Sequence, residues 1–187
     1  MVIHPVTLAL ARVERGEPGA SEALWRLVYE DLRQLASARL AGLGPGQTLQ
    51  ATALVNEVWM RLGGDAPQNF EGSAHFFGAA AGAMRNILVD QARRKGRLRR
   101  NSGKEAATLT PDVAAEAGGS TADVLALDEA LTAFAAQYER PARIVMLRFF
   151  AGLEIPKIAE LLGVSSRTVD REFLFARTWL RRSIGEP

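Results

Sequence analysis

The chain has 187 residues and a net charge of +2, with 48% hydrophobic residues, 24% charged residues and no cysteine. This length allows one medium domain or two small ones. The lack of cysteine excludes disulfides, thiolate zinc sites and thiol nucleophiles, and the two histidines, His4 and His75, have no metal-binding spacing. No apolar run approaches the ~20 residues of a membrane span and the N-terminus lacks a signal-peptide pattern, so we expect a cytoplasmic protein with no membrane, metal or cofactor partner.

The first hundred residues carry three segments with apolar residues at helical spacing. They predict helices over residues 20–40, 49–62 and about 74–94, and a glycine-rich stretch separates the first two. The third segment ends in a basic block that only Asp90 opposes in charge. Such a block either repels itself into a disordered tail or lies against a polyanion, and its continuity with an apolar helix favours the polyanion. The block contains Arg85, Arg93, Arg94, Lys95, Arg97, Arg99, Arg100 and Lys104.

Residues 101–120 have a different composition, with alanine, glycine, threonine and acidic residues and almost no large apolar side chain. Such a segment cannot bury enough surface to offset its ordering entropy, so a flexible linker is predicted. A second helical unit follows from residue 121, and sustained period-two alternation is found nowhere. We therefore predict an all-α protein with two small helical domains, over residues 1–100 and 121–187, joined by the linker over 101–120.

Residues 153–182 predict a helix-turn-helix, because Gly163 can end a first helix in the left-handed conformation and Ser165 can cap a second. A buried stripe recurs along the second helix at i, i+4, i+7 and i+11. It consists of Val169, Phe173, Ala176 and Leu180. The polar side chains on the other faces are candidates for contacts with a DNA groove and its phosphates, although an ordinary hairpin with a solvated charged face is the alternative. These side chains are Ser166, Arg167, Asp170, Arg171 and Arg177.

Four segments are informative through their order and spacing: residues 52–62, 70–77, 84–94, and 142–153 with the helix-turn-helix that follows. Together they resemble a bacterial RNA polymerase sigma factor of the small, two-domain extracytoplasmic-function (ECF) group of the sigma-70 family, over nearly the whole chain. The resemblance implies a region 2 helical bundle, a linker and a region 4 helix-turn-helix domain. The chain departs from many relatives at Ala53, at Asn56 and in the recognition helix, where it has Arg167-Thr168-Val169-Asp170-Arg171-Glu172. The scaffold residues agree and the reading residues differ, as in one fold adapted to another promoter sequence.

The resemblance implies three groups of contact residues. The helix over 52–62 would bind the clamp helices of the largest polymerase subunit through Leu54, Asn56, Glu57 and Arg61. The segments over 70–94 would contact the minus-ten element through Phe70, Ser73, His75, Phe76, Arg85, Asn86, Arg93 and Arg94. The recognition helix would contact the minus-thirty-five element through Ser166, Arg167, Thr168, Asp170, Arg171 and Arg177.

Elementary chemistry is consistent with these roles. Aromatic faces can stack unpaired bases, at about 1–3 kcal/mol per base, while cations follow the backbone. Phenylalanines beside an alanine-rich helix are more often core residues, so at most one of Phe70, Phe76 and Phe77 is assigned to a base pocket. Asn86 can bond a base edge or simply face solvent. A linker of roughly 20 residues extends to at most about 70 Å, and the promoter elements lie roughly 58 Å apart. The linker spans them only when it is nearly stretched, so we expect it to be ordered on polymerase and mobile without it.

The expected function is promoter recognition by a non-enzymatic factor that binds core RNA polymerase, at the clamp helices and the flap, and helps to melt promoter DNA. An anti-sigma protein is a further partner class that the resemblance implies, and no small-molecule substrate is expected. The alternative is a free-standing helix-turn-helix regulator, which would normally dimerise on paired half-sites and would leave the Asn56-Glu57-Arg61 helix without a task. A nucleic-acid enzyme would need a carboxylate cluster or an activated nucleophile, whereas the acidic residues here are scattered.

Overall fold

The computed structural model describes residues 5–41, 50–64, 70–101 and 121–185. Every regular element in these ranges is a helix, which confirms the all-α prediction. The helices are α1 (Pro5–Glu14), α2 (Ala20–Ala41), α3 (Ala51–Arg61), α4 (Ser73–Asn101), α6 (Thr121–Ala135), α7 (Glu139–Phe149), α8 (Ile155–Leu162) and α9 (Ser166–Ile184). No helix in these ranges has the length and apolar character needed to cross a membrane, and no group of three or more acidic or histidine residues there could hold a metal ion.

The observed helices agree with the predicted ones, with three differences. Helix α1 was not among the predicted helices; it starts with Pro5, a residue favoured at a first helical position. Helix α4 continues to Asn101, beyond the predicted end at residue 94, so the first residue assigned to the linker is helical. The helical unit from residue 121 is broken before Glu139 into α6 and α7. The predicted linker over 102–120 and the glycine-rich stretch over 42–48 lie outside the described residues.

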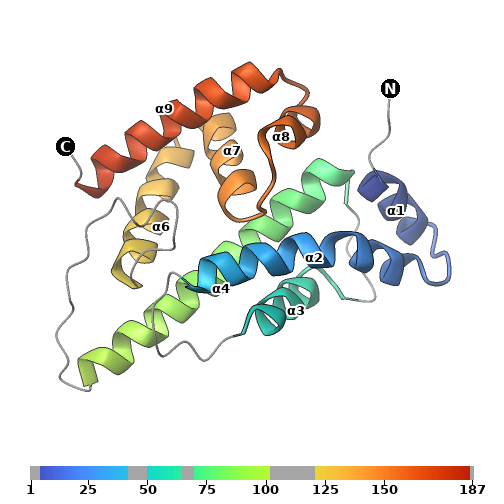
Figure 1. Cartoon of the computed structure of the whole chain (residues 1–187), viewed down its shortest axis with the longest axis horizontal. Helices are drawn as coiled ribbons and strands as arrows, with labels where there is room; N and C mark the ends of the chain where they lie inside the picture. The colour runs from blue at the N-terminus through green and yellow to red at the C-terminus, as the bar shows by residue number, and fades with distance from the viewer. Residues whose placement is uncertain (1–4, 42–49, 65–69, 102–120, 186–187) are drawn as a thin grey trace.

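Helix α4 is the central element of the molecule. Helix α3 packs on it, while α6 and α7 pack against it from the second half of the chain, and in Figure 1 α3 lies below α4 and α7 above it. Buried residues from α1 through α9 belong to one hydrophobic cluster. The division into domains at 1–100 and 121–187 therefore remains a prediction, because the described helices of the two parts are in direct contact.

A tight approach between the two parts occurs at Gly152, in the turn between α7 and α8. A Cβ atom at this glycine would lie 3.3 Å from Cβ and Cδ1 of Leu35 in α2, and its φ of +69° is in the left-handed region. A side chain at position 152 would thus be disfavoured by its backbone conformation and by the neighbouring leucine. This contact and the packing of α4 place the second half of the chain firmly on the first.

The helix-turn-helix forms as predicted. Gly163 ends α8 with φ of 65°, and the Ser165 hydroxyl accepts a hydrogen bond from the Thr168 amide at 3.1 Å at the start of α9. In the predicted stripe, Val169, Ala176 and Leu180 are buried, while Phe173 is half-buried. Helix α9 lies across α6 and α7 in Figure 1 and contacts both of them as well as α8.

Candidate nucleic-acid interface

The first turns of α9 present polar side chains to solvent. Ser166, Arg167, Asp170 and Arg171 are exposed, as is Arg177 two turns later, whereas Thr168 is half-buried and its hydroxyl lies 2.9 Å from that of Ser165. The positive end of a helix dipole and unpaired amides make such a start suited to phosphate. The buried stripe on the opposite side of α9 fixes which face these side chains occupy.

An ion pair between the buried carboxylate of Glu172 and the exposed guanidinium of Arg140 links α9 to α7. The Arg140 Nε atom donates to Glu172 Oε2 at 2.9 Å, and its Nη2 atom donates to Glu172 Oε1. The hydrogen bonds from Arg140 hold the pKa of the Glu172 carboxyl below its usual value, against the opposing effect of desolvation. Sequence reasoning had noted Glu172 only as part of the recognition-helix signature. Its partner lies 32 positions away in sequence, so spacing along α9 gave no signal for the pair.

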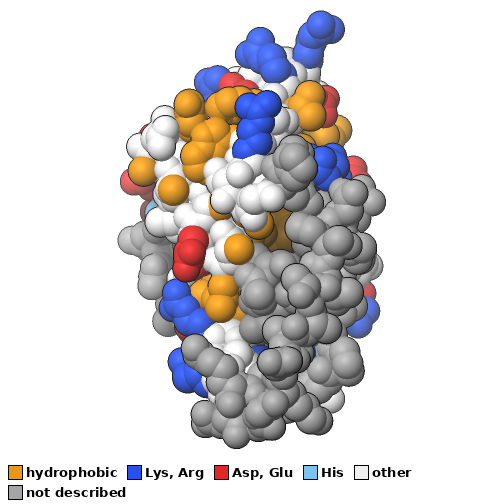
Figure 2. Space-filling view, turned by 90° about the vertical axis from the view of Figure 1, so that its left-hand side faces the viewer, with side chains coloured by type: hydrophobic (Ala, Val, Ile, Leu, Met, Phe, Trp, Pro, Cys, Tyr) orange, Lys and Arg blue, Asp and Glu red, His pale blue; other side chains and the backbone are white. Residues whose placement is uncertain are grey.

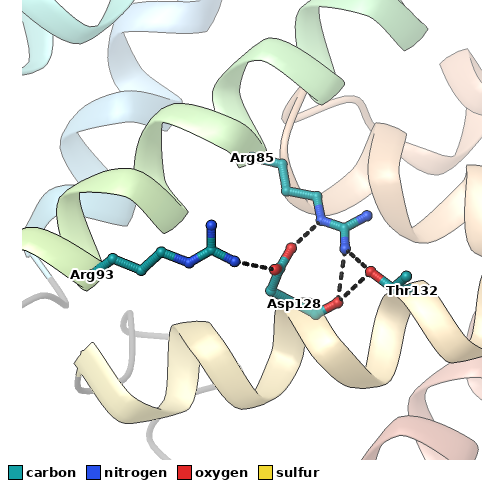
Figure 3. Close-up of polar contacts among 4 residues, drawn as sticks. All are labelled: Arg85, Arg93, Asp128 and Thr132. Carbon is teal, nitrogen blue, oxygen red and sulfur yellow. Dashed lines mark hydrogen bonds and ion pairs between the residues drawn. The ribbon is translucent and has the colours of Figure 1, made fainter.

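The basic face of α4 is divided between solvent and α6. Asn86, Arg93 and Arg94 are exposed. Arg85 is instead turned toward α6, where its Nε donates to Asp128 Oδ1 at 2.7 Å and its Nη2 donates to the Asp128 carbonyl at 2.7 Å and to Thr132 Oγ1 at 2.6 Å. Figure 3 shows these contacts, together with Arg93, whose Nη2 lies 3.9 Å from Asp128 Oδ2.

The aromatic segment before α4 contributes mainly to the core. Phe76 has 0% exposure and Ser73 is also buried, with its hydroxyl accepting from Thr7 Oγ1 at 3.0 Å. Phe70 is half-buried and meets His75 and Phe76 edge to face. We therefore remove Phe76 and Ser73 from the DNA-contacting set, because apolar packing and an internal hydrogen bond already use them. Phe70 and the exposed His75 are the members of this segment that remain candidates.

Helix α3 presents a narrow outer face. Leu54 has 0% exposure and belongs to the core, so it cannot touch a partner directly in this arrangement. Asn56 is exposed, and Glu57 Oε1 accepts from Arg61 Nη2 at 2.9 Å. Sequence reasoning missed Met60, which is 71% exposed on the same helix. Helical spacing could have indicated its exposure, because Met60 lies at i+4 from Asn56 and so on the polar face of the helix.

Further apolar side chains are exposed where α6, α7 and α9 meet. Tyr138, Leu174 and Phe175 are each partly open to solvent, and the Tyr138 and Phe175 rings are edge to face with centroids 5.0 Å apart. Figure 2 views the side of the molecule where the C-terminal ends of α4 and α9 lie, and it shows hydrophobic side chains exposed among arginine and lysine side chains. Exposed aromatic groups of this kind are typical of contact surfaces.

Comparison with known proteins supports the assignment of the chain. The model of a family described as ECF sigma factor matches residues 3–186. No curated protein matches the sequence.

Proposed function

The chain belongs to the ECF sigma factor family of non-enzymatic transcription initiation factors, which act with core RNA polymerase and promoter DNA, and we propose that three of its helices divide the contacts with polymerase and promoter. Helix α9 reads the upstream, minus-thirty-five element. Helix α4, with the segment before it, contacts and helps to melt the minus-ten element. Helix α3 binds the clamp helices of the polymerase.

The observation that carries this proposal is the start of α9. A capped helix there presents Arg167, Asp170 and Arg171 to solvent while Val169 and Glu172 hold the opposite side. Arginine can pair bidentately with guanine, and aspartate can accept from cytosine. These side chains are thus the ones on which upstream sequence preference depends.

Two further surfaces support the other roles. Asn86, Arg93 and Arg94 lie exposed along the outer part of α4, where an amide and cations suit single-stranded DNA. On α3, Asn56 and Met60 are exposed near the Glu57–Arg61 pair, and a flexible methionine at the centre of polar groups suits a protein contact. The proposed polymerase surface therefore consists of Asn56, Glu57, Met60 and Arg61, with Leu54 beneath it.

Transcription from a promoter library with core polymerase, with and without the chain, tests the proposal. We expect transcripts that depend on the chain, and Arg167→Ala should lower them about tenfold by removing a base or phosphate contact. Arg182→Ala is the matched control, because Arg182 is exposed in the last turn of the same helix. Absence of any chain-dependent transcript would contradict the sigma-factor role proposed for this chain, and binding of the chain to duplex DNA as a dimer without polymerase would favour a free-standing regulator.

A further inference from the structure

Leu174 is an apolar side chain in the middle of the exposed face of α9. It is 63% exposed, whereas Ala176 on the same helix is fully buried. Successive residues of an α-helix are rotated by about 100°, so Leu174 lies about 160° away from Ala176 and within about 60° of four charged side chains proposed to contact the upstream element. These four are Arg167, Asp170, Arg171 and Arg177. Leu174 therefore belongs to the face that points away from the rest of the protein.

The next residue, Phe175, belongs to a different surface. Its ring lies edge to face with that of Tyr138, with centroids 5.0 Å apart, and its centroid is 5.7 Å from that of Phe134 in α6. Phe175 is thus part of an aromatic cluster that joins α9 to α6. On the exposed face, Thr178 donates its hydroxyl to the Leu174 carbonyl at 2.9 Å. Because that hydroxyl bonds within the helix, Leu174 gives this part of the face an apolar centre.

Neighbouring charge separates Leu174 from Leu27, another exposed leucine among the described residues. Leu27 in α2 is 48% exposed, and acidic residues follow it at i+3 and i+4 on its own face. Those carboxylates would repel phosphate. Leu174 has Arg171 at i−3 and Arg177 at i+3 instead. An apolar side chain between two cations suits a partner surface that is apolar at its centre and anionic at its edges.

The major groove of DNA offers such a surface at a thymine. Thymine presents its 5-methyl group there, and apolar side chains make contact with it. The first turns of a recognition helix lie in this groove. Leu174 is seven residues after Arg167, which corresponds to about 10 Å along the helix axis and to roughly three base-pair steps of about 3.4 Å. The two side chains are therefore spaced to face different base pairs of one upstream element.

We propose that Leu174 is a specificity-determining residue that contacts the 5-methyl group of a thymine in the upstream element, about three base pairs from the pair that Arg167 faces. This inference rests on the proposed function of α9 in upstream recognition. Leucine cannot form a hydrogen bond, so it selects through the methyl group and against bases that would leave an amino group unpaired beneath it. Cytosine and adenine both present such a group in the major groove.

The first test compares sequence preferences. Core polymerase with the chain transcribes a promoter library that is randomised across the upstream element. Leu174→Ala should lower the preference for thymine at one position by about fourfold, which is the loss expected for about one buried methylene, and should keep the other preferences. Leu174→Asn should move the preference at that position to adenine, with which asparagine pairs. Leu27→Ala removes the same atoms from an exposed position in α2 and should change no preference.

The second test removes the methyl group from the DNA. Deoxyuridine, which lacks only the 5-methyl group, replaces the selected thymine on one strand at a time. The original chain should lose about fourfold in transcription from the uridine template, while Leu174→Ala should transcribe both templates equally. Each comparison uses one protein on two templates, so a change in the stability of the variant does not account for the difference.

The outcomes separate the role of Leu174 from the sigma-factor role. An equal loss on uridine in the original chain and in Leu174→Ala would overturn the thymine contact, even if the chain directs transcription. A uniform drop for Leu174→Ala across the library, with no change in thymine preference, would also overturn it and would assign Leu174 to a protein contact.

A lack of any chain-dependent transcript would refute the proposed promoter function without deciding the role of Leu174. The uridine comparison is then made by fluorescence anisotropy on duplexes that the chain alone selects from a random pool. A methyl effect that is lost in Leu174→Ala would support the thymine contact. Equal affinities for thymine and uridine duplexes in the original chain, or no binding of duplex DNA, would overturn it.

Discussion

The two helices proposed to bind DNA present their basic side chains in opposite ways. At the start of α9, Arg167 and Arg171 are exposed. On α4, Arg85 is held by Asp128 and Thr132 of α6. The surface proposed for upstream contacts is thus open to solvent, while the surface proposed for the minus-ten element is partly covered by α6. A basic residue in a nucleic-acid motif can thus be neutralised from within the same molecule.

The two surfaces also differ in what supports them. Helix α9 is fixed from within its own half of the chain, by a buried stripe and by the ion pair between Arg140 and Glu172. The covered side of α4 is fixed by helices from the other half. Damage to the support of α9 should therefore weaken the fold of the second half itself, whereas damage to the cover of α4 should weaken the packing of that half on α4.

The largest effect is expected from Ile158→Ala, which removes support beneath α9. Ile158 has 0% exposure in α8, so the cavity should lower the free energy of unfolding by about 2–5 kcal/mol. Urea unfolding followed by circular dichroism measures this. Leu174→Ala, at a side chain that is 63% exposed, is the control and should change stability by less than about 0.5 kcal/mol. Equal midpoints for both variants would contradict this view of α9.

The next effect is expected from Glu172→Gln, which breaks the charged pair with Arg140. Loss of charge-assisted hydrogen bonds at the buried carboxylate should cost about 1.5 kcal/mol at neutral pH, the low end of the range for such bonds, because solvent reaches Arg140. Glu160→Gln, in an exposed pair with Lys157, should cost less than about 1 kcal/mol. Denaturant unfolding of both variants at neutral pH makes the comparison, and similar losses would contradict a special role for Glu172.

The ion pair between Glu172 and Arg140 also predicts that the stability of the fold depends on pH. Because Arg140 lowers the pKa of Glu172 in the folded chain, the unfolded chain binds the proton more readily. The stabilisation is therefore fully present above the ordinary glutamate pKa of about 4.3 and is lost as the pH falls through the lower folded-state value. The stability difference between the original chain and Glu172→Gln should shrink below about pH 4, and a difference that stayed constant down to acid pH would show that another group is responsible.

A smaller effect sharpens the contrast within α4 itself. Arg94 is exposed, so Arg94→Gln should reduce the slope of log affinity for single-stranded DNA against log salt concentration by about 0.7. Arg85→Gln should change the slope less in the free chain, because Arg85 is already paired with Asp128. A salt titration of DNA binding by both variants provides the measurement. An equal change for both would mean that Arg85 reaches DNA as readily as Arg94 does.

The smallest effect is expected from Gly82→Ala in α4. A Cβ atom there would meet no other residue within 4 Å, so alanine should raise the free energy of unfolding by about 0.5–1 kcal/mol through the entropy of the unfolded chain. Gly152→Ala is the contrasting variant and should be destabilising, since its φ of +69° and Leu35 both oppose a side chain. In thermal unfolding, the midpoint temperature of Gly82→Ala should therefore be higher than that of Gly152→Ala.

The sequence predicted those parts of the fold that depend on neighbouring residues. The Gly163 end of α8 and the Ser165 cap are local signals that the structure confirms, and three of the four residues of the predicted α9 stripe are buried. Helix α4 continues past its predicted end at residue 94. The prediction stopped there because the basic, polar segment lacks the apolar spacing from which helices were predicted. The family assignment rested on four short segments in a fixed order, and the family match confirms it.

The parts that the sequence could not give depend on distant residues. Arg85 and Asp128 are 43 positions apart, and a predicted linker between them gave no reason to pair them. Phe70 and Phe76 belong to one aromatic segment, yet Phe76 is buried while Phe70 is half-buried, which only the packing of α4 decides. On α3, by contrast, helical spacing alone separates the buried Leu54 from the exposed Met60, which lies at i+4 from Asn56 on the polar face.

The close approach of Gly152 to Leu35 should also leave a mark on the evolution of the family. Position 152 needs a residue that tolerates a positive φ, which in practice means glycine, asparagine or aspartate. A relative that packs in the same way but carries asparagine at position 152 should carry a residue smaller than leucine at position 35. Paired changes in size at these two sites would identify, across sequences alone, which family members share this contact between the turn after α7 and α2.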